Sequence, residues 1–450
     1  MFESEDLRVL AQALGTLSTG FESLPAFSAP ADDTRLAEVL QETAARLRDN
    51  FPYPHPLYAG QMMKPPHAVA RLAYMLALYL NPNNHALDGG RASSAMEKEA
   101  VANLAHMFGY TEHLGHLCAS GTIANLEALW AARHLHPQGV VLASQEAHYT
   151  HARMCEVLGV PFETVAVDSA GCMDLDALEV RLRQGDVATV VATLGTTALG
   201  AVDPLPGILE LRARHGFRIH ADAAYGGYFM LAGNLGAPAR AAFDALSQAD
   251  SIVVDPHKHG LQPYGCGCVL LRDPGEGRFY KHNSPYTYFT SHAMHLGEIS
   301  LECSRPGASA VALWATQRLL PMERGGDFAR GLESGRDAAL ALYRHLETVS
   351  GYLAAPEPEL DIVVWTVAAP SRGAASRRAQ AVFDAAAQHG LHLALLKVPA
   401  TLASRWWPEL GADAEAVTAL RSCLMKPEHR EWLARILSLL DAATQQAAGA

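Results

Sequence analysis

A lysine at the end of a strongly apolar segment is the first candidate for chemistry. Lys258 follows the run Ser251-Ile-Val-Val and lies in the sequence Asp255-Pro-His-Lys-His-Gly. Most lysines lie on solvated faces with the ammonium group in water. A lysine that is desolvated at the end of a buried strand has a lowered pKa instead, and its amine can form an imine with a carbonyl cofactor. The polar neighbours Asp255, His257 and His259 favour this second interpretation, because a core strand would carry aliphatic residues there.

An acidic residue ends a second apolar run. The segment Phe217-Arg-Ile-His-Ala-Asp places Asp222 at the end of a predicted buried strand, directly before Ala223-Ala-Tyr-Gly-Gly. A buried carboxylate needs a partner, because an unpaired one costs several kcal/mol or takes up a proton. A salt bridge or a helix N-cap would also explain Asp222 alone. Beside Lys258, it predicts a carboxylate that pairs with a cationic group of a ligand.

Three further segments add groups that bind a flat, phosphorylated ligand. Ser120-Gly121-Thr122 leads into a helical pattern, and backbone N–H groups at such a helix start form a phosphate cradle, although an ordinary N-cap gives the same pattern. His148 follows the predicted strand Val140–Ser144, where its ring could stack on an aromatic ligand. His148 and His151 are spaced like a metal pair, but no third ligand is evident. Thr193-Leu-Gly-Thr-Thr supplies hydroxyl groups at another strand end.

Together these groups match what a protein contributes to pyridoxal phosphate chemistry. They include a lysine for an imine, an acid for a protonated ring nitrogen, a flat side chain for stacking and a phosphate loop. The cofactor is the electron sink, and the protein orients and tunes it. The sequence therefore predicts a pyridoxal-phosphate enzyme.

An α/β fold is needed to bring these groups together. Short apolar runs separated by helical patterns predict a mostly parallel sheet that is buried on both faces, and its ligands should lie beyond the carboxyl ends of the strands. The predicted strands are Val140–Ser144, Phe162–Val167, Val187–Leu194, Phe217–Asp222, Ser251–Asp255 and Cys266–Leu271.

The pattern changes after Pro306, which predicts a small α+β domain. Its expected helices and strands are Ala308–Leu320, Asp327–Ser350, Leu360–Val367, Leu391–Lys397, Ala416–Met425 and a last helix from Glu428. We expect a helical arm over residues 1–60, a large cofactor-binding domain over 61–305 and the small domain over 306–450. The Pro-rich end of the arm is expected to pack on a neighbouring subunit.

Composition excludes several other classes of protein. The chain has 450 residues and a formal net charge of −12, without a Lys/Arg run that would follow a phosphate backbone, so a nucleic-acid partner is not expected. No apolar run is long enough to span a membrane, and the acidic start lacks the features of a signal peptide, so we expect a cytoplasmic protein. The seven cysteines predict reduced core thiols, and Cys266-x-Cys268 alone does not predict a metal site.

In this order, the motifs resemble the group II pyridoxal-phosphate-dependent amino-acid decarboxylases, a family that includes glutamate and aromatic L-amino-acid decarboxylases. The resemblance covers most of the chain and rests on His55-Pro56, Ala92–Glu99, Cys118–Asn125, Gln145–His148, Thr193–Thr197, His220–Tyr225, Asp255–His259 and Leu301–Gly307. It implies the fold of the aspartate aminotransferase group (fold type I), decarboxylation of an L-amino acid to a primary amine, and a homodimer with active sites at the interface.

The resemblance also implies roles for single residues. Lys258 is similar to the imine-forming lysine, Asp222 to the partner of the pyridine nitrogen, His148 to the ring-stacking residue and Ala224 to the small residue under the ring. The positions that resemble the phosphate-binding and ring-flanking residues are Ala119, Ser120, Gly121, Asp255, His257 and Thr196.

The substrate-binding residues are less clearly indicated. Arg305 and Arg421 are candidates for a substrate carboxylate, because a guanidinium group binds carboxylates through two hydrogen bonds, although ordinary ion pairs explain them equally well. Tyr58 and Gln61 could shape a pocket across a dimer interface, and Tyr288 is a further candidate for contact with the substrate. Family members that resemble the aromatic enzymes carry a proton-donating tyrosine on a loop after the lysine. Here the interval from Tyr280 to Arg305 is shortened, and neither Tyr286 nor Tyr288 aligns with that tyrosine.

Three alternatives remain open on the sequence. Aminotransferases, β-lyases and aldolases of fold type I share the lysine, the aspartate and the phosphate loop. Loss of the loop tyrosine diverts related enzymes toward decarboxylation-dependent oxidative deamination. A non-catalytic scaffold with the same fold is the third alternative, which the presence of both Lys258 and Asp222 disfavours.

Overall fold

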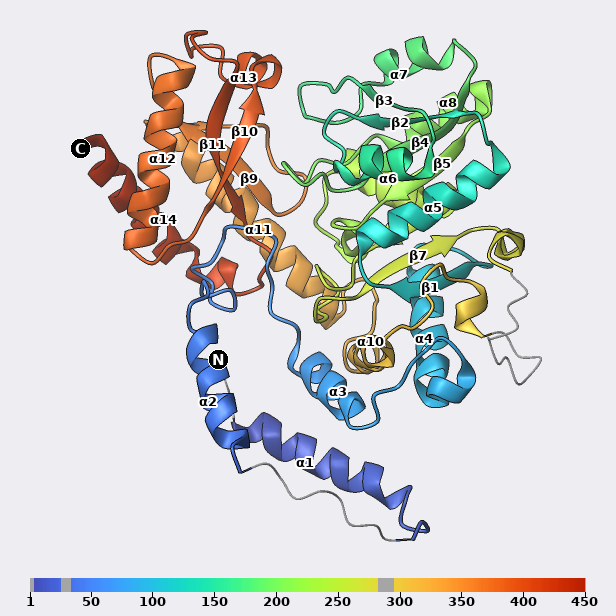
Figure 1. The fold of residues 1–450 in the computed structure, drawn as a ribbon. Coiled ribbons are helices and arrows are strands. Elements are labelled where there is room, and N and C mark those ends of the chain that lie inside the picture. Colours follow the sequence, from blue (N-terminus) through green and yellow to red (C-terminus); the bar gives the residue numbers. More distant parts are fainter. Residues whose placement is uncertain (1–3, 26–33, 282–294, 450) are drawn as a thin grey trace.

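The protein is described here by a computed structural model that covers residues 4–25, 34–281 and 295–449 (Figure 1). Its larger sheet has seven strands in the order β1-β7-β6-β5-β4-β2-β3. β7 is antiparallel to its neighbours β1 and β6, and the pairs β2–β3, β2–β4, β4–β5 and β5–β6 are parallel. The strands are β1 Leu114–Cys118, β2 Val140–Ser144, β3 Phe162–Val165, β4 Val187–Thr193, β5 Arg218–Asp222, β6 Ser251–Val254 and β7 Gly267–Leu271. The mostly parallel sheet expected from the apolar runs is confirmed.

Burial explains why the sequences of these strands are continuous apolar runs. Every residue of β2, β5, β6 and β7 is buried, as expected for strands that are covered on both faces. α5 packs against β5, β6 and β7, and α4 packs against β1. The helices of this domain include α4 Leu87–Met107, α5 Gly121–Leu135, α6 Thr150–Leu158, α7 Leu175–Leu182, α8 Leu205–His215 and α9 Ala237–Asp244. Because the parallel strands share a direction, the residues that follow β2, β4, β5 and β6 meet at one edge of the sheet.

The smaller domain is an antiparallel sheet with helices packed on it, beside the large sheet in Figure 1. Its strand order is β10-β11-β9-β8, and α11, α12 and α14 pack against strands or one another. The elements are α11 Asp327–Thr348, β8 Tyr352–Ala354, β9 Ile362–Val367, α12 Arg372–Gln388, β10 Ala394–Pro399, α13 Ala400–Trp406, β11 Ala416–Cys423 and α14 His429–Gly449. β8, α12 and α13 were not predicted, since β8 and α13 are short and α12 buries chiefly alanines, which give little hydrophobic periodicity.

The remaining helices lie at the base of the large domain. α10 Gly307–Leu319 packs on α3 Ala68–Leu78 and on α4, so this helix contacts the large domain although it follows the boundary predicted at Pro306. α1 Ser4–Thr19 contacts α3, whereas α2 Leu36–Leu47 has no buried residue and stands apart from both domains in Figure 1. Short 3-10 turns occupy Gly227–Leu231, Leu246–Gln248, Pro274–Phe279 and Leu296–Glu298. No helix within the described ranges is long and apolar enough to cross a membrane.

A buried ion pair fixes the start of β5, the strand that ends in Asp222. Arg218 donates two hydrogen bonds to Glu276, at 2.7 and 2.8 Å, and both side chains are less than a tenth exposed. Glu276 belongs to the turn after β7, so the pair joins two strands that are not neighbours in the sheet. Removing one partner of such a pair leaves an uncompensated buried charge.

We therefore predict that Glu276→Gln lowers the free energy of unfolding by about 3 kcal/mol, because Arg218 keeps its charge and loses its counter-ion. Urea unfolding followed by circular dichroism measures the change. Asp327→Asn is the matched control, since the Asp327–Arg330 pair is largely exposed and its loss should cost under about 1 kcal/mol. Equal losses in the two variants would contradict the structural role given to the buried pair.

Candidate active site

A cavity of about 270 Å³ lies at the carboxyl edge of the large sheet, where the sequence placed the site. It brings together most of the residues predicted for the cofactor: Ser120, Gly121, His148, Asp222, Ala224, Asp255, His257 and Lys258. Thr122, Thr193 and Thr197, which the sequence singled out for their hydroxyl groups, also line the cavity. Sequence reasoning did not single out the other wall residues: Asn125, Tyr149, Thr150, Gly195 and Tyr225. Gly195 and Tyr225 follow the ends of β4 and β5, which is a signal in the sequence, whereas Asn125 lies within α5 and is brought to the cavity by tertiary packing.

Lys258 is held in this cavity by a carboxylate from its own turn. Its Nζ lies 3.0 Å from Oδ2 of Asp255, and the side chain is 22% exposed. Burial lowers the pKa of Lys258, but the nearby Asp255 and Asp222 carboxylates outweigh it, so the pKa lies above its usual value. The lowered pKa expected from the sequence is therefore wrong for this state of the protein, because burial is only one of the two influences on the amine.

Asp222 is buried and surrounded by hydrogen-bond donors. Oδ2 accepts from Nε2 of His151 at 2.9 Å and from Nδ2 of Asn125 at 3.4 Å, and Oδ1 accepts from the backbone N–H of Ala224 at 3.1 Å. Burial raises the pKa of Asp222, but the His151 hydrogen bond and the neighbouring cationic groups lower it more, so the pKa lies well below its usual range. The carboxylate is thus kept ionised in the interior.

His220 supports this arrangement from the same strand as Asp222. Its Nε2 lies 2.7 Å from Oδ1 of Asn125, and its Nδ1 lies 2.9 Å from Oγ of Ser251 on the neighbouring strand. Burial lowers the pKa of His220 to about 3, so the ring is neutral at physiological pH. It orients the Asn125 amide so that the NH2 group faces Asp222.

The start of α5 forms the end of the cavity predicted for phosphate. A Cβ on Gly121 would lie 2.7 Å from Oδ2 of Asp255, so only a glycine leaves this space open. A Cβ on Gly267 would lie 2.5 Å from the backbone carbon of Ser120, which shows how closely β7 approaches the loop. Ala119 is not part of the wall, and its backbone N–H donates to Glu302 at 3.0 Å. Thr122, one residue beyond the positions assigned from the family, lines the cavity instead.

Two histidines of the wall are neutral donors or acceptors. Nδ1 of His257 lies 2.7 Å from the carbonyl oxygen of Cys266, which makes Nδ1 the donor and leaves Nε2 3.6 Å from Oδ2 of Asp255. His148 accepts from the backbone N–H of Thr150 at 3.2 Å. Burial lowers the pKa of both rings. Thr196 is fully buried with its hydroxyl accepting from Ala201, so the cavity wall is formed by Thr197 rather than by Thr196.

The candidate substrate residues separate into two groups. Arg421, on β11, donates to Thr197 O at 2.9 Å and to Oε1 of Gln61 at 2.5 Å, which places both residues next to the cavity wall. The hydroxyl of Tyr58 accepts from the backbone N–H of Gln61 at 3.3 Å. Arg305 lies elsewhere: it pairs with buried Glu97 at 2.8 Å and also donates to Leu117 O. Tyr286 and Tyr288 lie outside the described residues.

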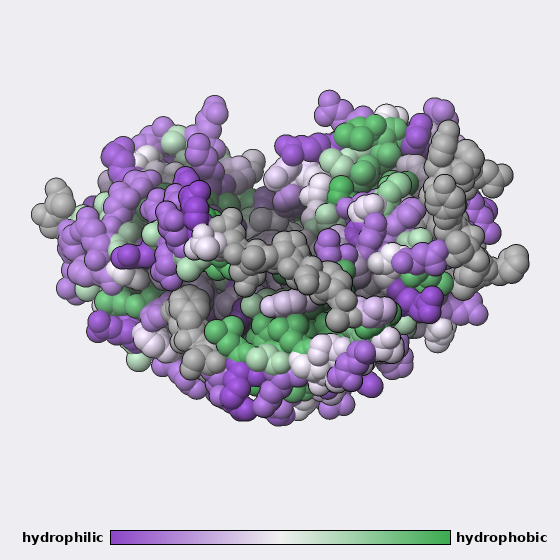
Figure 2. Space-filling model, turned by 60° about the horizontal axis from the view of Figure 1, so that its bottom comes forward, coloured by the Kyte–Doolittle hydropathy of each residue, from purple (hydrophilic) through white to green (hydrophobic). Residues whose placement is uncertain are grey.

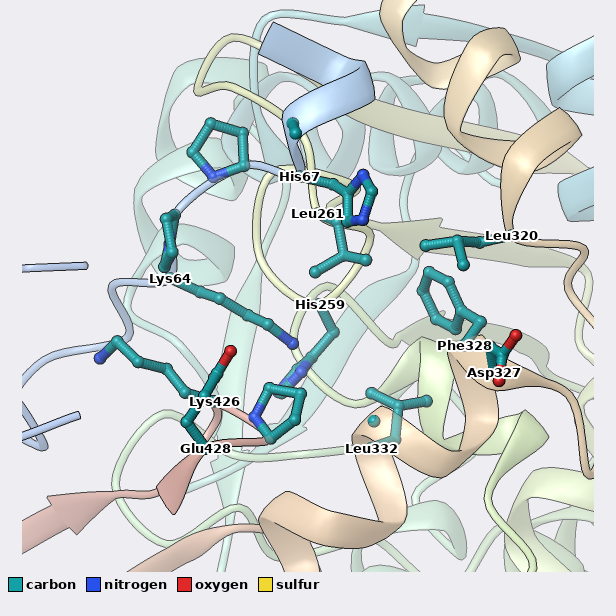
Figure 3. A pocket seen from close by; sticks show the side chains of 15 residues that line it. Lys64, His67, His259, Leu261, Leu320, Asp327, Phe328, Leu332, Lys426 and Glu428 are labelled. Carbon is teal, nitrogen blue, oxygen red and sulfur yellow. The ribbon is translucent and has the colours of Figure 1, made fainter. Parts of the chain in front are cut away.

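A second cavity, of about 380 Å³, is lined by His259 and Leu261, which closely follow Lys258 in the sequence (Figure 3). Lys64, His259, Phe328 and Leu332 are among its wall residues, and none of the predicted cofactor residues lies there. The two cavities share a buried partition, because Asp361 accepts from the hydroxyl of Tyr225 at 2.6 Å and lies 3.2 Å from Nε2 of His259. Tyr225 faces the lysine cavity, and His259 faces the second one.

Comparison with known proteins agrees with this geometry. Residues 24–364 match the family model of the pyridoxal-dependent decarboxylase conserved domain. The chain belongs to this family. Pyridoxal phosphate is therefore its cofactor, and the Lys258 cavity has the amine, the carboxylate and the helix start that the cofactor requires. The resemblance inferred from the motifs is confirmed.

Individual relatives show how far the likeness extends. The chain is 29% identical to L-tyrosine decarboxylase of Enterococcus faecium, over 69% of this chain and 67% of that protein. It is 30% identical to cysteine sulfinic acid decarboxylase of Mus musculus, over 71% of this chain and 69% of that protein. A crystal structure of Oryza sativa TDC with PLP and tryptamine has the same fold, with a TM-score of 0.78, 18% identity and 99% of each chain covered.

Buried neutral histidines give the protein a predictable acid sensitivity. Burial lowers the pKa of His220 to about 3 and that of His429 to about 4, whereas imidazoles of an unfolded chain titrate near about 6.5. Below pH about 6.5 the unfolded chain therefore binds protons that the folded chain does not. The stability contributed by these two rings should be fully present above that pH and fall toward pH 4, by up to about 1.4 kcal/mol per pH unit for each ring. Asp203 contributes with the opposite sign, because burial raises its pKa to about 7.

Urea unfolding of the cofactor-free protein at pH 7, 6 and 5 tests this prediction. In His220→Gln the free energy of unfolding should change less steeply with pH, because one buried ring is removed. His136→Gln, on the exposed surface, should leave the pH dependence unchanged. A His220→Gln variant whose stability changes with pH in the same way as that of the wild type between pH 7 and pH 5 would show that the buried ring does not act in this way.

Proposed function

We propose that the protein decarboxylates an L-amino acid to the primary amine and carbon dioxide, with Lys258 as the lysine that binds the cofactor's aldehyde group. The observation that carries this proposal is the single cavity shared by Lys258, Asp222 and the start of α5. Bound pyridoxal phosphate supplies the electron sink for the electrons released from the α-carbon. A screen of the common amino acids, scored for carbon dioxide and amine, tests it.

Each side of the cavity has a role in holding the cofactor. Ser120, Gly121 and Thr122 would bind the phosphate at the α5 start, and His148 would lie against the ring. Asp222 would face the pyridine nitrogen and favour its protonated form. The structure gives Asp255 a different partner from the one the family resemblance implies. A carboxylate cannot donate a hydrogen bond to phosphate, and this one holds the ammonium group of Lys258.

Arg421 is the better of the two candidates for the substrate carboxylate. Both arginines are buried, but Arg305 has the carboxylate of Glu97 as its counter-ion. The hydrogen bonds of Arg421 go to a carbonyl and an amide oxygen, and no carboxylate within the described ranges forms an ion pair with it. A buried cation without a counter-ion is costly unless a ligand provides one. Arg421 also borders the cavity through Thr197, so a carboxylate at that end could replace Gln61 as its partner.

The position of the carboxylate selects the reaction. A bond to the α-carbon is weakened when it is held perpendicular to the conjugated ring, so an enzyme that fixes the carboxylate out of plane favours loss of carbon dioxide. Oxidative deamination with aldehyde as product is the second candidate, since neither Tyr286 nor Tyr288 aligns with the family's loop tyrosine. Product analysis separates the two, because only simple decarboxylation leaves a primary amine.

We also propose a homodimer that covers the base of the molecule. α2 has no buried residue, although it carries several leucines. Leu36, Leu40 and Leu47 are each more than half exposed to solvent in the single chain. Figure 2 shows apolar side chains on the face where α1 to α3 lie. Exposed apolar surface of this kind is typical of subunit interfaces, and a second copy of the chain provides a symmetric partner.

Lys258→Ala should abolish attachment of the cofactor. Borohydride reduction of the wild-type holoenzyme should add the mass of the reduced cofactor to the peptide that contains Lys258, and the variant should show no such adduct, because its side chain has no amine. Mass spectrometry of the digested protein measures this. Lys397→Ala, on the exposed part of β10, is the control. An adduct that persists in the Lys258 variant would place the cofactor on another residue.

Sedimentation velocity at micromolar concentration should show a dimer. Replacing Leu40 and Leu47 by Glu should shift the protein toward monomer, because the charges would be buried unpaired in the interface. Val180→Glu, on an exposed position of α7, should leave the dimer intact. A wild-type protein that is active as a monomer would contradict the proposed assembly.

A further inference from the structure

His151 is a buried histidine that contacts Asp222 of the site without lining the cavity itself. It lies on α6, three residues after His148, and its side chain is fully buried. Nε2 lies 2.9 Å from Oδ2 of Asp222. The two histidines do not converge on a metal ion, because Nδ1 of His148 accepts from Thr150 and Nε2 of His151 faces the carboxylate.

The proton on His151 can be assigned from its partner. An ionised carboxylate only accepts hydrogen bonds, so Nε2 of His151 must carry a hydrogen. Nδ1 has no hydrogen-bond partner within the described part of the chain. All the polar contacts of this buried ring are thus directed at Asp222, which is unusual for a residue with only a packing role.

Counting acceptor positions on Asp222 shows what His151 does. Oδ2 is occupied by His151 and Asn125, and Oδ1 has the backbone N–H of Ala224 as its one donor. A carboxylate oxygen accepts two hydrogen bonds, so Oδ1 keeps one position open. Asp222 lines the cavity, so the protonated ring nitrogen of a bound cofactor can donate a hydrogen bond to this open position of Oδ1.

A cation in the same cavity competes for this carboxylate. Asp222 raises the pKa of Lys258, although Asp255 is the nearer carboxylate and raises it more. A carboxylate that could rotate freely would be drawn toward the ammonium group whenever Lys258 is released from the cofactor. Hydrogen bonds on Oδ2 prevent that rotation, and the one from His151 is the shorter of the two.

We propose that His151 is a positioning residue that holds Asp222 in the orientation required for protonation of the cofactor's ring nitrogen. This inference rests on the proposed function only in that the cofactor ring faces Asp222. His151 acts through Asp222 and does not line the cavity itself. Its influence on the reaction should therefore appear at the ring nitrogen rather than in substrate binding.

The test uses His151→Phe, which keeps a flat ring and removes the donor, and His151→Gln, whose amide can donate again. Each variant is reconstituted with pyridoxal phosphate labelled with ¹⁵N at the ring nitrogen. In the Phe variant, the ¹⁵N resonance should move toward the unprotonated position, and kcat should fall about 10- to 100-fold with KM changed less than about threefold. The Gln variant should recover much of both. His134→Phe, on the exposed side of α5, is the matched control.

Each outcome has one interpretation. A Phe variant with the wild-type ¹⁵N resonance overturns the positioning role, even if its melting temperature falls, because a packing residue would act on stability alone. If the Phe variant does not fold, His151→Met replaces it, and the same resonance decides. An Asp222→Asn holoenzyme with the same ¹⁵N resonance as the wild type would instead contradict the placement of the ring against Asp222, and with it the proposed function.

Discussion

The site depends on keeping one carboxylate ionised inside the protein. Asp222 ends a fully buried strand, where an isolated charge would cost several kcal/mol. Donors from three directions offset that cost: His151 from α6, Asn125 from α5 and the backbone N–H of Ala224. Asn125 is oriented by His220, which in turn reaches Ser251 on β6. The ionised state of Asp222 therefore depends on how α5 and α6 pack on the sheet, because these helices carry two of its hydrogen-bond donors.

A second carboxylate, that of Asp255, lies in the same cavity but has a different partner. Asp255 lies 3.0 Å from Nζ of Lys258, whereas Asp222 accepts hydrogen bonds from His151, Asn125 and Ala224, so the two acids have different nearest partners. The small domain contributes from the other side, since Arg421 on β11 reaches Thr197 in the cavity wall and Asp361, just before β9, holds Tyr225. The small domain thus contacts residues of the cavity wall, and its movement would change the position of Arg421 relative to Lys258.

The sequence predicted the sheet, the lysine turn and the phosphate loop because each depends on local signals. β2 was predicted to the residue, and Lys258 and Asp222 were recognised as polar residues after apolar runs. Partners that depend on tertiary contacts were not predictable. His151 was noticed only for its spacing from His148, and the difference between Arg305 and Arg421 depends on Glu97, which is distant from both in sequence. α12 was missed because its buried face is mostly alanine, which resembles a polar helix or a loop in a hydropathy pattern.

The fate of the substrate's carboxyl group tests the central claim most directly. With the best substrate from the amino-acid screen labelled with ¹³C at the carboxyl carbon, we expect the label in carbon dioxide and an equal amount of primary amine in solution. Asp222→Ala, which removes the partner of the ring nitrogen, should lower the rate of label release by about 10²-fold or more. Label retained in a 2-oxo acid would contradict decarboxylation in favour of an aminotransferase, and aldehyde in place of amine would indicate oxidative deamination.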